Sequence, residues 1–471
     1  MTINAARTGN GAGTSIGARL DTLPVGRMHV KIIVAVGLGL FFEMYEIFLS
    51  STMSVALKTE WGLQGLELQL LLASSFVGMF LGAALLSGMA DKLGRRRAFM
   101  LNLIWFSVWS LIAAFAQEPW FLVMARFFAG VGLGAEYPVA DAYLSDILPK
   151  KNRGKLASYA YTCSYLAVPA LGFLSLWIAG RTIFEVDGWR CLLALGAIGA
   201  VLVMFLRRGI PESPRWLAEQ GRHDEAEQAL AMFTSGTSST NPAQQASEEV
   251  ASVKNPTEPD MEVTDPPAPH SRRRLFQRPY SKRLTMLTIF HLFQTFGYYG
   301  FGTMAALVLV SRGYDVTTSL LFVALSFIGY PVGSLISTPL LARFERKYLL
   351  AGSIIALAAF GLGFANASDP TLIVVFGFLT TVTGQIYSNT FHIYQAEIFP
   401  TSLRVTAVGW TYSLSRLSSA AMPFMLIPVL NQHGAGAMFT IIMVALAIVT
   451  ASILTMGPRT SNRSLEDINP R

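Results

Sequence analysis

The sequence predicts an all-α integral membrane protein whose twelve transmembrane helices form two pseudo-symmetric six-helix bundles. Of its 471 residues, 52% are hydrophobic and only 14% are charged, whereas a soluble domain carries roughly 25% charged residues. Apolar runs of roughly 18 residues or more, each long enough to cross a bilayer, recur along the chain. The two halves of the chain also match each other at a constant spacing. These observations exclude a soluble globular protein.

A charged turn at residues 88–97, Gly-Met-Ala-Asp-Lys-Leu-Gly-Arg-Arg-Arg, separates the second and third predicted helices. Its bases must lie in water at the membrane face, and the excess of Lys and Arg assigns that face to the cytoplasm. The connections after the second, fourth and sixth helices are all basic. We therefore expect both termini in the cytoplasm and the protein in the plasma membrane, the inner membrane of a bacterium.

The predicted helices divide the chain into two bundles with tails and a linker. The first six helices are expected at residues 28–57, 67–89, 98–116, 120–148, 156–179 and 189–206. The second six are expected at residues 284–310, 317–341, 348–365, 371–394, 402–427 and 435–456. The domains are then a disordered cytoplasmic tail (1–27), a bundle (28–217), a cytoplasmic linker that begins with an amphipathic helix (218–282), a bundle (283–457) and a cytoplasmic tail (458–471).

One shift of 251 positions superimposes the two halves. It maps the end of the fourth helix onto the end of the tenth, with Tyr143, Asp146 and Arg153 falling on Tyr394, Glu397 and Arg404. It also maps residues 91–96 of the charged turn onto 342–347, where the bases are kept. Because each half has an even number of helices, the copies share one orientation about an axis normal to the membrane. Two such bundles can rock about a central cavity and expose a site to each side in turn, which predicts a transporter.

Several motifs identify the family. They are the charged turn, the run Arg126-x-x-x-Gly130-x-Gly132-x-Gly134 and the paired acid-x-x-Pro-x-x-x-Arg motifs after the fourth and tenth helices. Together they resemble the major facilitator superfamily. The string Pro-Glu-Ser-Pro-Arg-Trp-Leu at 211–217 is similar to that of sugar porters and the allied organic-ion (metabolite:proton symporter) group. The resemblance implies the major facilitator fold and secondary active transport by alternating access.

Two acids on the first helix are candidates for proton coupling, because a charge inside a membrane is costly and therefore suggests function. Glu43 and Glu46 lie three residues apart and share a helix face. Two close carboxylates in a medium of low dielectric constant leave a group able to bind and release a proton near neutrality. Arg126 on the fourth helix is expected at a similar depth. Tyr45-Glu46 resembles the Tyr-Asp pair of proton-coupled sugar porters, which implies that Glu46 pairs with Arg126; a fixed structural ion pair is the alternative.

Arg416 is predicted near the midplane of the eleventh helix, where a guanidinium group can bind a carboxylate through two hydrogen bonds. The alternative is an internal salt bridge with Glu136 or a first-helix acid. Other candidate substrate-binding residues are polar or aromatic: Gln294, Tyr298, Glu136, Gln385 and Asn389, accompanied by Tyr299 and Tyr387. His291 and His392 are predicted to be structural.

Charged residues at the cytoplasmic helix ends are expected to act as latches that close the cytoplasmic side. They are Asp91, Arg95, Arg96, Asp146, Arg153, Arg343, Glu397 and Arg404, with Glu212 and Arg215 as further contributors. The alternative for this group is a solvated surface.

The leading hypothesis is proton-coupled import of a small organic anion, an aromatic acid or another monocarboxylate. The alternatives are a sugar or polyol:proton symporter, an efflux antiporter for drugs or metabolites, and a membrane sensor that does not transport. No nucleophile, metal or cofactor motif is present, so neither an enzyme nor a metal or cofactor site is expected. The net charge of +7 lies in short loops, which does not favour nucleic acid as a partner. The expected partners are the substrate, protons and the lipid bilayer, and the protein is expected to be a monomer.

Overall fold

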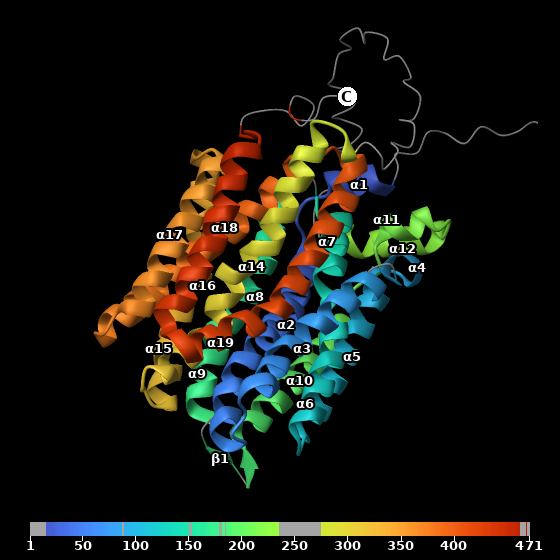
Figure 1. The fold of residues 1–471 in the computed structure, drawn as a ribbon. Helices are drawn as coiled ribbons and strands as arrows, with labels where there is room; N and C mark the ends of the chain where they lie inside the picture. Colours follow the sequence, from blue (N-terminus) through green and yellow to red (C-terminus); the bar gives the residue numbers. More distant parts are fainter. Residues whose placement is uncertain are drawn as a thin grey trace, which may run out of the picture.

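The computed structural model describes residues 16–86, 89–149, 153–178, 181–183, 185–234, 275–461 and 468. Within them the helices form two bundles, one from each half of the chain, which lie side by side (Figure 1). The polar linker predicted at 234–271 lies almost entirely outside the described residues, as do residues 1–15.

The first bundle contains six membrane-length spans. They are α2 (Arg27–Glu60), α3 (Gly65–Leu86), α5 (Arg95–Ala114), α6 (Pro119–Gly134) with α7 (Glu136–Ile147), α8 (Arg153–Tyr165) with α9 (Ala167–Ile178), and α10 (Gly188–Arg207). The short α4 (Met89–Leu93) lies in the charged turn. A two-stranded antiparallel hairpin, β1 (Thr182–Ile183) and β2 (Val186–Asp187), connects α9 to α10.

The second bundle repeats this arrangement. Its spans are α14 (Tyr280–Ser311), α15 (Val316–Phe327) with α16 (Gly329–Arg343), α17 (Arg346–Asn366), α18 (Pro370–Glu397) and α19 (Thr401–Met456). The long α19 contains two spans, because Gly434 in its middle has non-helical angles of φ 79° and ψ 179°. The twelve predicted spans are therefore confirmed. By length and composition alone, nine helical stretches in the described part of the chain could cross a membrane. The two spans of α19 are counted as one of these nine stretches.

Three spans that the sequence predicted as continuous helices are broken near their middle. Each break precedes a proline, which lacks an N–H group and whose ring clashes with the carbonyl group four residues earlier. The prolines are Pro138, Pro169 and Pro331, and the residues four positions earlier are Gly134, Tyr165 and Phe327, at which α6, α8 and α15 end. Each break thus coincides with a proline, and the breaks separate α7, α9 and α16 from the helices before them.

Glycines bring α3 and α6 into backbone contact. A Cβ atom at Gly78 would lie 2.0 Å from the carbonyl oxygen of Phe127, and one at Gly130 would lie 2.2 Å from that of Ser75. Small residues four apart are typical of closely packed membrane helices. The glycine run that follows Arg126 therefore fixes the depth and rotation of that arginine within the first bundle.

Three short helices cover one end of the first bundle: α1 (Ile16–Thr22), α11 (Pro214–Glu219) and α12 (His223–Thr234). The amphipathic helix predicted near 218–233 corresponds to α12. The prediction of a disordered tail is wrong for residues 16–22. Leu20 of α1 is buried, and the Asp21 carboxylate lies 3.0 Å from the Arg153 guanidinium and 2.8 Å from that of Arg215. One buried apolar side chain and one shared acid hold this helix in place.

The 251-residue repeat is visible in the contacts. Arg95 lies 3.5 Å from Asp146, and the equivalent Arg346 lies 3.2 Å from Glu397. The Tyr143 hydroxyl donates to the carbonyl oxygen of Pro211 (2.6 Å), and the equivalent Tyr394 hydroxyl donates to that of Pro458 (2.8 Å). We call the end of the molecule that carries these arginines, together with α1, α11 and α12, the basic end. The β1–β2 hairpin lies at the opposite end (Figure 1).

The halves meet through α2 against α14, α3 against α19, and α9 against α15. Beyond the middle of α2, toward the opposite end, the Phe48 ring lies 5.7 Å from that of Phe327 and 5.6 Å from that of Tyr330. The Ser51 hydroxyl also donates to the carbonyl oxygen of Thr303 across the interface (3.0 Å). By contrast, every ion pair between described residues joins side chains of the same half. The halves are therefore packed together toward the opposite end and are not joined by such ion pairs at the basic end.

Candidate functional site

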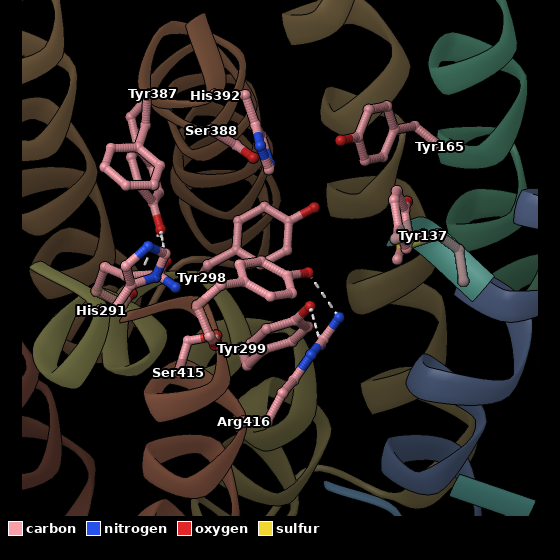
Figure 2. A pocket seen from close by; sticks show the side chains of 14 residues that line it. Tyr137, Tyr165, His291, Tyr298, Tyr299, Tyr387, Ser388, His392, Ser415 and Arg416 are labelled. Atoms are coloured by element: carbon pink, nitrogen blue, oxygen red, sulfur yellow. Dashed lines mark hydrogen bonds between the residues drawn. The ribbon is translucent and has the colours of Figure 1, made fainter. Parts of the chain in front are cut away.

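A cavity lies between the two halves, with an empty volume of about 580 Å³ that includes the part open to solvent. Its wall is mostly aromatic: Met44, Tyr137, Tyr165, His291, Gln294, Tyr298, Tyr299, Tyr387, Ser388, Phe391, His392, Tyr412, Ser415 and Arg416. His392 lies near the end of α18 at the basic end and is exposed, so the cavity opens in that direction. Figure 2 shows Tyr137 and Tyr165 on one side and the second-half residues on the other.

Equivalent positions of the two halves contribute to this wall. Tyr137 and Ser388 are 251 positions apart, as are Tyr165 and Arg416, and all four line the cavity. The cavity therefore lies where the two repeats face each other. This is the location that the internal repeat predicts for a transport site.

Arg416 is the only arginine among the described lining residues, and only 2% of its surface is exposed. One guanidinium nitrogen donates to the Tyr299 hydroxyl at 2.9 Å and another donates to the Tyr412 hydroxyl at 2.8 Å. Its Nε atom has no hydrogen-bond partner, and no described carboxylate lies within ion-pair distance. The alternative of an internal salt bridge is therefore not observed. A buried cation whose partners are all neutral can form charge-assisted hydrogen bonds with an anion.

Two predicted binding residues line the cavity and two lie behind its wall. Gln294 accepts a hydrogen bond from the Tyr387 hydroxyl through Oε1 (2.5 Å), and the Tyr298 hydroxyl donates to Oε1 of Gln385 (3.3 Å). The Gln385 amide in turn donates to Asn389 (2.8 Å). Gln294 and Tyr298 are thus cavity residues, whereas Gln385 and Asn389 are not among the lining residues and act by holding Tyr298 in position.

The predicted pairing of Glu46 with Arg126 is present. Arg126 Nη1 lies 2.5 Å from Oε2 of Glu46, and Nη2 donates to the backbone oxygen of Glu46 (2.8 Å) and to the hydroxyl of Ser50 (2.9 Å). Ser110 donates to the other carboxylate oxygen (2.5 Å). Both charged side chains have 0% exposure and do not line the cavity. The two charges are thus paired inside the first bundle, and only Nε of Arg126 in this group lacks a hydrogen-bond partner.

Glu43 differs from Glu46 in having no partner. It is fully buried, and neither of its carboxylate oxygens forms a hydrogen bond with any described residue. Its charge interacts with those of Glu136, Arg416 and Asp141. Since Arg416 belongs to the second half, Glu43 is electrostatically linked across the interface between the halves. An unpaired carboxylate in such a place is costly to keep ionised.

The prediction that Glu136 binds substrate is not supported by its position. Its carboxylate lies 3.4 Å from a guanidinium nitrogen of Arg207, and it is not among the lining residues. Arg207 also donates to the carbonyl oxygen of Ala35 (3.2 Å) and stacks on the ring of Phe99 (3.5 Å to the centroid). The break before Pro138 places Glu136 at the first residue of α7, where it meets α10 instead of the cavity.

The predicted latch residues form contacts within each half. Arg95 pairs with Asp146, Arg346 with Glu397, and Arg153 with Asp21. Glu212 accepts the backbone N–H of Arg96 (2.9 Å), whose guanidinium donates to the carbonyl oxygen of Arg208 (2.7 Å). Arg343 is exposed, and the side chains of Asp91 and Arg404 lie outside the described set. Closure across the two halves by these residues stays a prediction.

Sequence reasoning missed several residues of the cavity wall. His291 and His392 were predicted to be structural, yet both line the cavity, as do Tyr137, Tyr165 and Tyr412. Two signals were present in the sequence. Tyr412 precedes Arg416 by four residues and so lies on the same helix face, and Tyr165 is the repeat equivalent of Arg416. No comparable signal marked His291.

Two six-helix bundles around a central cavity define a multi-pass membrane transporter of the major facilitator superfamily. The chain belongs to the sugar (and other) transporter family, whose model matches residues 32–471. The membership predicted from the motifs is therefore confirmed, and the protein is a transporter and not an enzyme.

Two curated relatives cover most of the chain. It is 30% identical over 402 residues to the putative metabolite transport protein YyaJ of Bacillus subtilis, covering 85% of this chain and 86% of the relative. It is 28% identical over 455 residues to the niacin transporter NiaP of Acinetobacter baylyi, covering 96% and 99%. Among solved structures, the inward-open xylose transporter XylE from E. coli matches with a TM-score of 0.72 at 18% identity, covering 93% of this chain and 99% of that one. At this identity the structural likeness establishes the fold alone.

Proposed function

We propose that this transporter imports a small organic anion, an aromatic acid or another monocarboxylate, by proton-coupled alternating access. The observation that carries the proposal is Arg416, a buried guanidinium group in the cavity wall whose described partners are two neutral hydroxyls. A carboxylate can bind such a group through charge-assisted hydrogen bonds. The aromatic wall around it offers rings against which an aromatic substrate can pack.

The relatives support the same substrate class. One of them is named as a transporter of niacin, which is a pyridine carboxylic acid. The cavity of this chain offers the two features that such a molecule needs, a cation for the carboxylate and aromatic faces for the ring.

Proton coupling is assigned to the acids of α2. Glu46 is bound by Arg126 and Ser110, whereas Glu43 has no partner and is electrostatically linked to Arg416. An ionised Glu43 and a substrate carboxylate compete for the same guanidinium charge. Protonation of Glu43 therefore favours binding of the anion, and this competition couples proton binding to substrate binding. We assign the basic end to the cytoplasm, from the positive-inside rule, and the protein to the plasma membrane.

The test is uptake of radiolabelled benzoate and nicotinate into proteoliposomes with an imposed proton gradient. We expect accumulation that an uncoupler abolishes. Arg416→Ala should lose accumulation while inserting normally, and Arg416→Lys should be strongly impaired because lysine lacks the two-pronged geometry. Arg222→Ala, at the residue just before α12, where the side chain is 37% exposed, is the matched control. Accumulation by Arg416→Ala at the wild-type rate would contradict the proposal.

A sugar or polyol:proton symporter is the second candidate. The amide of Gln294 in the cavity wall favours it, since amides bind sugar hydroxyls, and the fold also matches that of a D-xylose–proton symporter (TM-score 0.70). Stabilisation of the purified protein by neutral sugars and not by carboxylates would select it. Movement of the anion out of vesicles in exchange for protons that enter from an acidic exterior would indicate an efflux antiporter, and binding without accumulation would indicate a sensor.

A further inference from the structure

We infer that His291 is a second recognition point for the substrate, and that the substrate is an aromatic monocarboxylate with a hydrogen-bonding group on its ring. The inference rests on the proposed function, in which Arg416 binds the carboxylate. It adds a requirement at the end of the substrate away from its carboxylate, where a ring hydroxyl or a ring nitrogen contacts the imidazole of His291.

His291 has two ring nitrogens whose hydrogen-bonding capacity no described residue meets. Among the described lining residues, only Arg416 (Nε) and His291 (both ring nitrogens) have buried polar side-chain atoms without a hydrogen-bond partner. His291 is 1% exposed, so bulk water does not substitute for a partner. Gln395 lies near the imidazole and interacts with it. However, Gln395 forms no hydrogen bond of normal geometry with His291, and its amide nitrogen instead lies 3.3 Å from Nδ1 of His392.

The other hydroxyl groups nearby are already engaged. Those of Tyr299 and Tyr412 accept from Arg416. The hydroxyls of Tyr298 and Tyr387 donate to Gln385 and Gln294, respectively. The hydroxyls of Tyr299 and Tyr412 keep their own protons to donate, but both lie beside Arg416. Away from the guanidinium, the unpaired buried polar atoms of the described wall are those of His291.

The two recognition points are spaced for a small aromatic molecule. The imidazole centroid lies 5.7 Å from the centroid of Tyr412, and the Arg416 guanidinium carbon lies 5.2 Å from the same centroid. The two groups are thus separated by at most the sum of these distances, roughly 11 Å. Between the imidazole centroid and the guanidinium carbon, an aromatic acid with a hydrogen bond of about 2.9 Å at each end spans roughly 11 Å when its two groups are meta and roughly 12 Å or more when they are para, so the spacing favours a meta-substituted ring such as that of nicotinate. Figure 2 shows His291 and Arg416 at separate points of the cavity wall.

The order of the two groups along the cavity also fits. His291 precedes Tyr299 by eight residues on α14, which is roughly 12 Å of helix. Since Arg416 bonds to Tyr299, His291 lies nearer to the basic end, where exposed His392 marks the opening. A bound acid would therefore direct its carboxylate inward and its ring substituent toward the opening.

The chemistry of imidazole defines what it selects. A neutral imidazole has one N–H donor and one acceptor nitrogen. A phenol can donate to the acceptor, and a pyridine nitrogen can accept from the N–H group. Benzoate has neither and leaves both imidazole nitrogens unpaired. The site should therefore prefer hydroxybenzoates or pyridine carboxylates over benzoate by roughly 3- to 10-fold in affinity, the worth of one neutral hydrogen bond.

The test is a set of affinities measured by thermal shift and by competition with uptake. The probes are benzoate, 3- and 4-hydroxybenzoate, nicotinate and isonicotinate, applied to the full-length protein in liposomes or detergent. His291→Phe keeps a ring and removes both nitrogens, while His291→Gln keeps a donor and an acceptor. His433→Phe is the matched control. His433 is exposed and lies beside the non-helical Gly434 in the middle of α19.

We expect the wild type and His433→Phe to prefer at least one ring-substituted acid over benzoate. His291→Phe should bind benzoate normally and lose the preference, and His291→Gln should keep part of it. A preference that survives in His291→Phe, or none in the wild type despite binding of benzoate, overturns the inference and leaves the proposed function standing. Failure of every aromatic acid to bind the wild type overturns the inference together with the aromatic form of the proposed function, and leaves only a non-aromatic monocarboxylate as the anion.

Discussion

Two buried arginines show how surroundings decide the role of a charge. Arg126 lies 2.5 Å from a carboxylate and donates to a backbone oxygen and a hydroxyl. Arg416 is equally buried but meets only the hydroxyls of Tyr299 and Tyr412 among the described residues. The first charge is neutralised within the protein, and the second has no carboxylate partner among the described residues. This difference is why we propose Arg416, and not Arg126, as the group that binds a substrate carboxylate.

The Glu46–Arg126 pair can be tested for a role beyond stability. Arg126→Met leaves a buried carboxylate without its cation, and we expect the free energy of unfolding to fall by about 3–5 kcal/mol. The double variant Glu46→Leu with Arg126→Met removes both charges and should recover most of that loss. Thermal unfolding in detergent measures both. Equal destabilisation in the single and double variants would contradict a charge-pairing origin, and uptake by a stable double variant would show that the pair is structural only.

Sequence reasoning succeeded at residues whose chemistry is conspicuous in a membrane. Glu46, Arg126 and Arg416 are charges in apolar runs, and their depths along the helices follow from the constant helical rise. It misplaced Glu136 and His291 relative to the cavity wall, because their positions depend on which way a helix face points. The direction of Glu136 depends on the break before Pro138, and that of His291 on how α14 is rotated toward the cavity. A pattern of hydrophobic residues predicts neither the break before Pro138 nor the rotation of α14.

At the scale of elements, local sequence rules account for much of the fold. The prolines that interrupt α6–α7, α8–α9 and α15–α16 act through their missing N–H groups. The close contact of α3 with α6 depends on glycines. Each break lies four residues before a proline, but Pro339 in α16 and Pro423 and Pro428 in α19 cause no such break, so a proline alone does not predict one. The docking of α1 could not be predicted from the sequence either, because it depends on Arg153 and Arg215, which are far away in the chain.

The α3–α6 contact gives a sharp prediction. Gly130→Ala places a Cβ atom where the carbonyl oxygen of Ser75 lies only 2.2 Å away, and two backbones cannot give way as a flexible side chain does. We expect a loss of about 1–3 kcal/mol or more, measured as a lower thermal midpoint, with reduced uptake because Arg126 shifts with α6. Gly352→Ala on α17, where a Cβ atom meets nothing within 4 Å, should be neutral or stabilising. Similar midpoints for the two variants would contradict the packing argument.

The segment that follows the last span is held at the basic end by Glu345. Its carboxylate accepts the backbone N–H groups of Thr460 (3.0 Å) and Ser461 (3.3 Å). The pKa of the Glu345 carboxyl is below its ordinary value: burial acts to raise it, but these hydrogen bonds outweigh burial and lower it. A lowered folded-state pKa means that the stabilisation is present at neutral pH, above the unfolded value of roughly 4.3. It is lost as the pH falls through the folded value.

We therefore expect Glu345→Gln to loosen residues 457–461 at neutral pH. The amide keeps an acceptor but loses the charge, so roughly 1 kcal/mol of local stability should disappear. Hydrogen exchange at Thr460 and Ser461 measures it, with faster exchange in the variant than in the wild type. In the wild type, acidification below pH 4 should have the same effect once intrinsic exchange rates are corrected. Unchanged exchange in the variant would assign the attachment to the neighbouring contacts, such as the Tyr394 hydroxyl on Pro458.

At the scale of the whole molecule, the two halves form one state of an alternating-access cycle. They are packed together toward the opposite end, where Phe48 of the first half fills the space beside Gly302 of the second. The cavity opens toward the basic end, where every described ion pair lies within one half. The alternate state requires that the contact at Phe48 separates and that the halves approach at the basic end. The repeat predicted both bundles, but which of their faces meet depends on the sum of many small contacts and could not be predicted from the sequence.

A substitution at the contact between Phe48 and Gly302 should shift the equilibrium between the two states. A Cβ atom at Gly302 would lie 2.4 Å from the Phe48 ring, so Gly302→Trp should prevent the halves from closing there and favour the state open toward the opposite end. We expect uptake to fall roughly tenfold or more, since a shift of about 1.4 kcal/mol changes the balance of states tenfold. Substrate binding should persist, because Arg416 is unchanged.

Thiol labelling distinguishes this conformational effect from a folding defect. In a background with Cys163 and Cys191 replaced by serine, His392→Cys should react with an impermeant reagent added at the basic end, since His392 lines the open mouth. Gly302→Trp should slow that reaction, because the mouth closes as the opposite end opens. Gly409→Trp, at a position where a Cβ atom meets nothing within 4 Å, should change neither uptake nor labelling. If Gly302→Trp loses uptake while His392→Cys stays equally reactive, the two ends do not move in opposition, and the rocking of two rigid halves is the wrong description of this transporter.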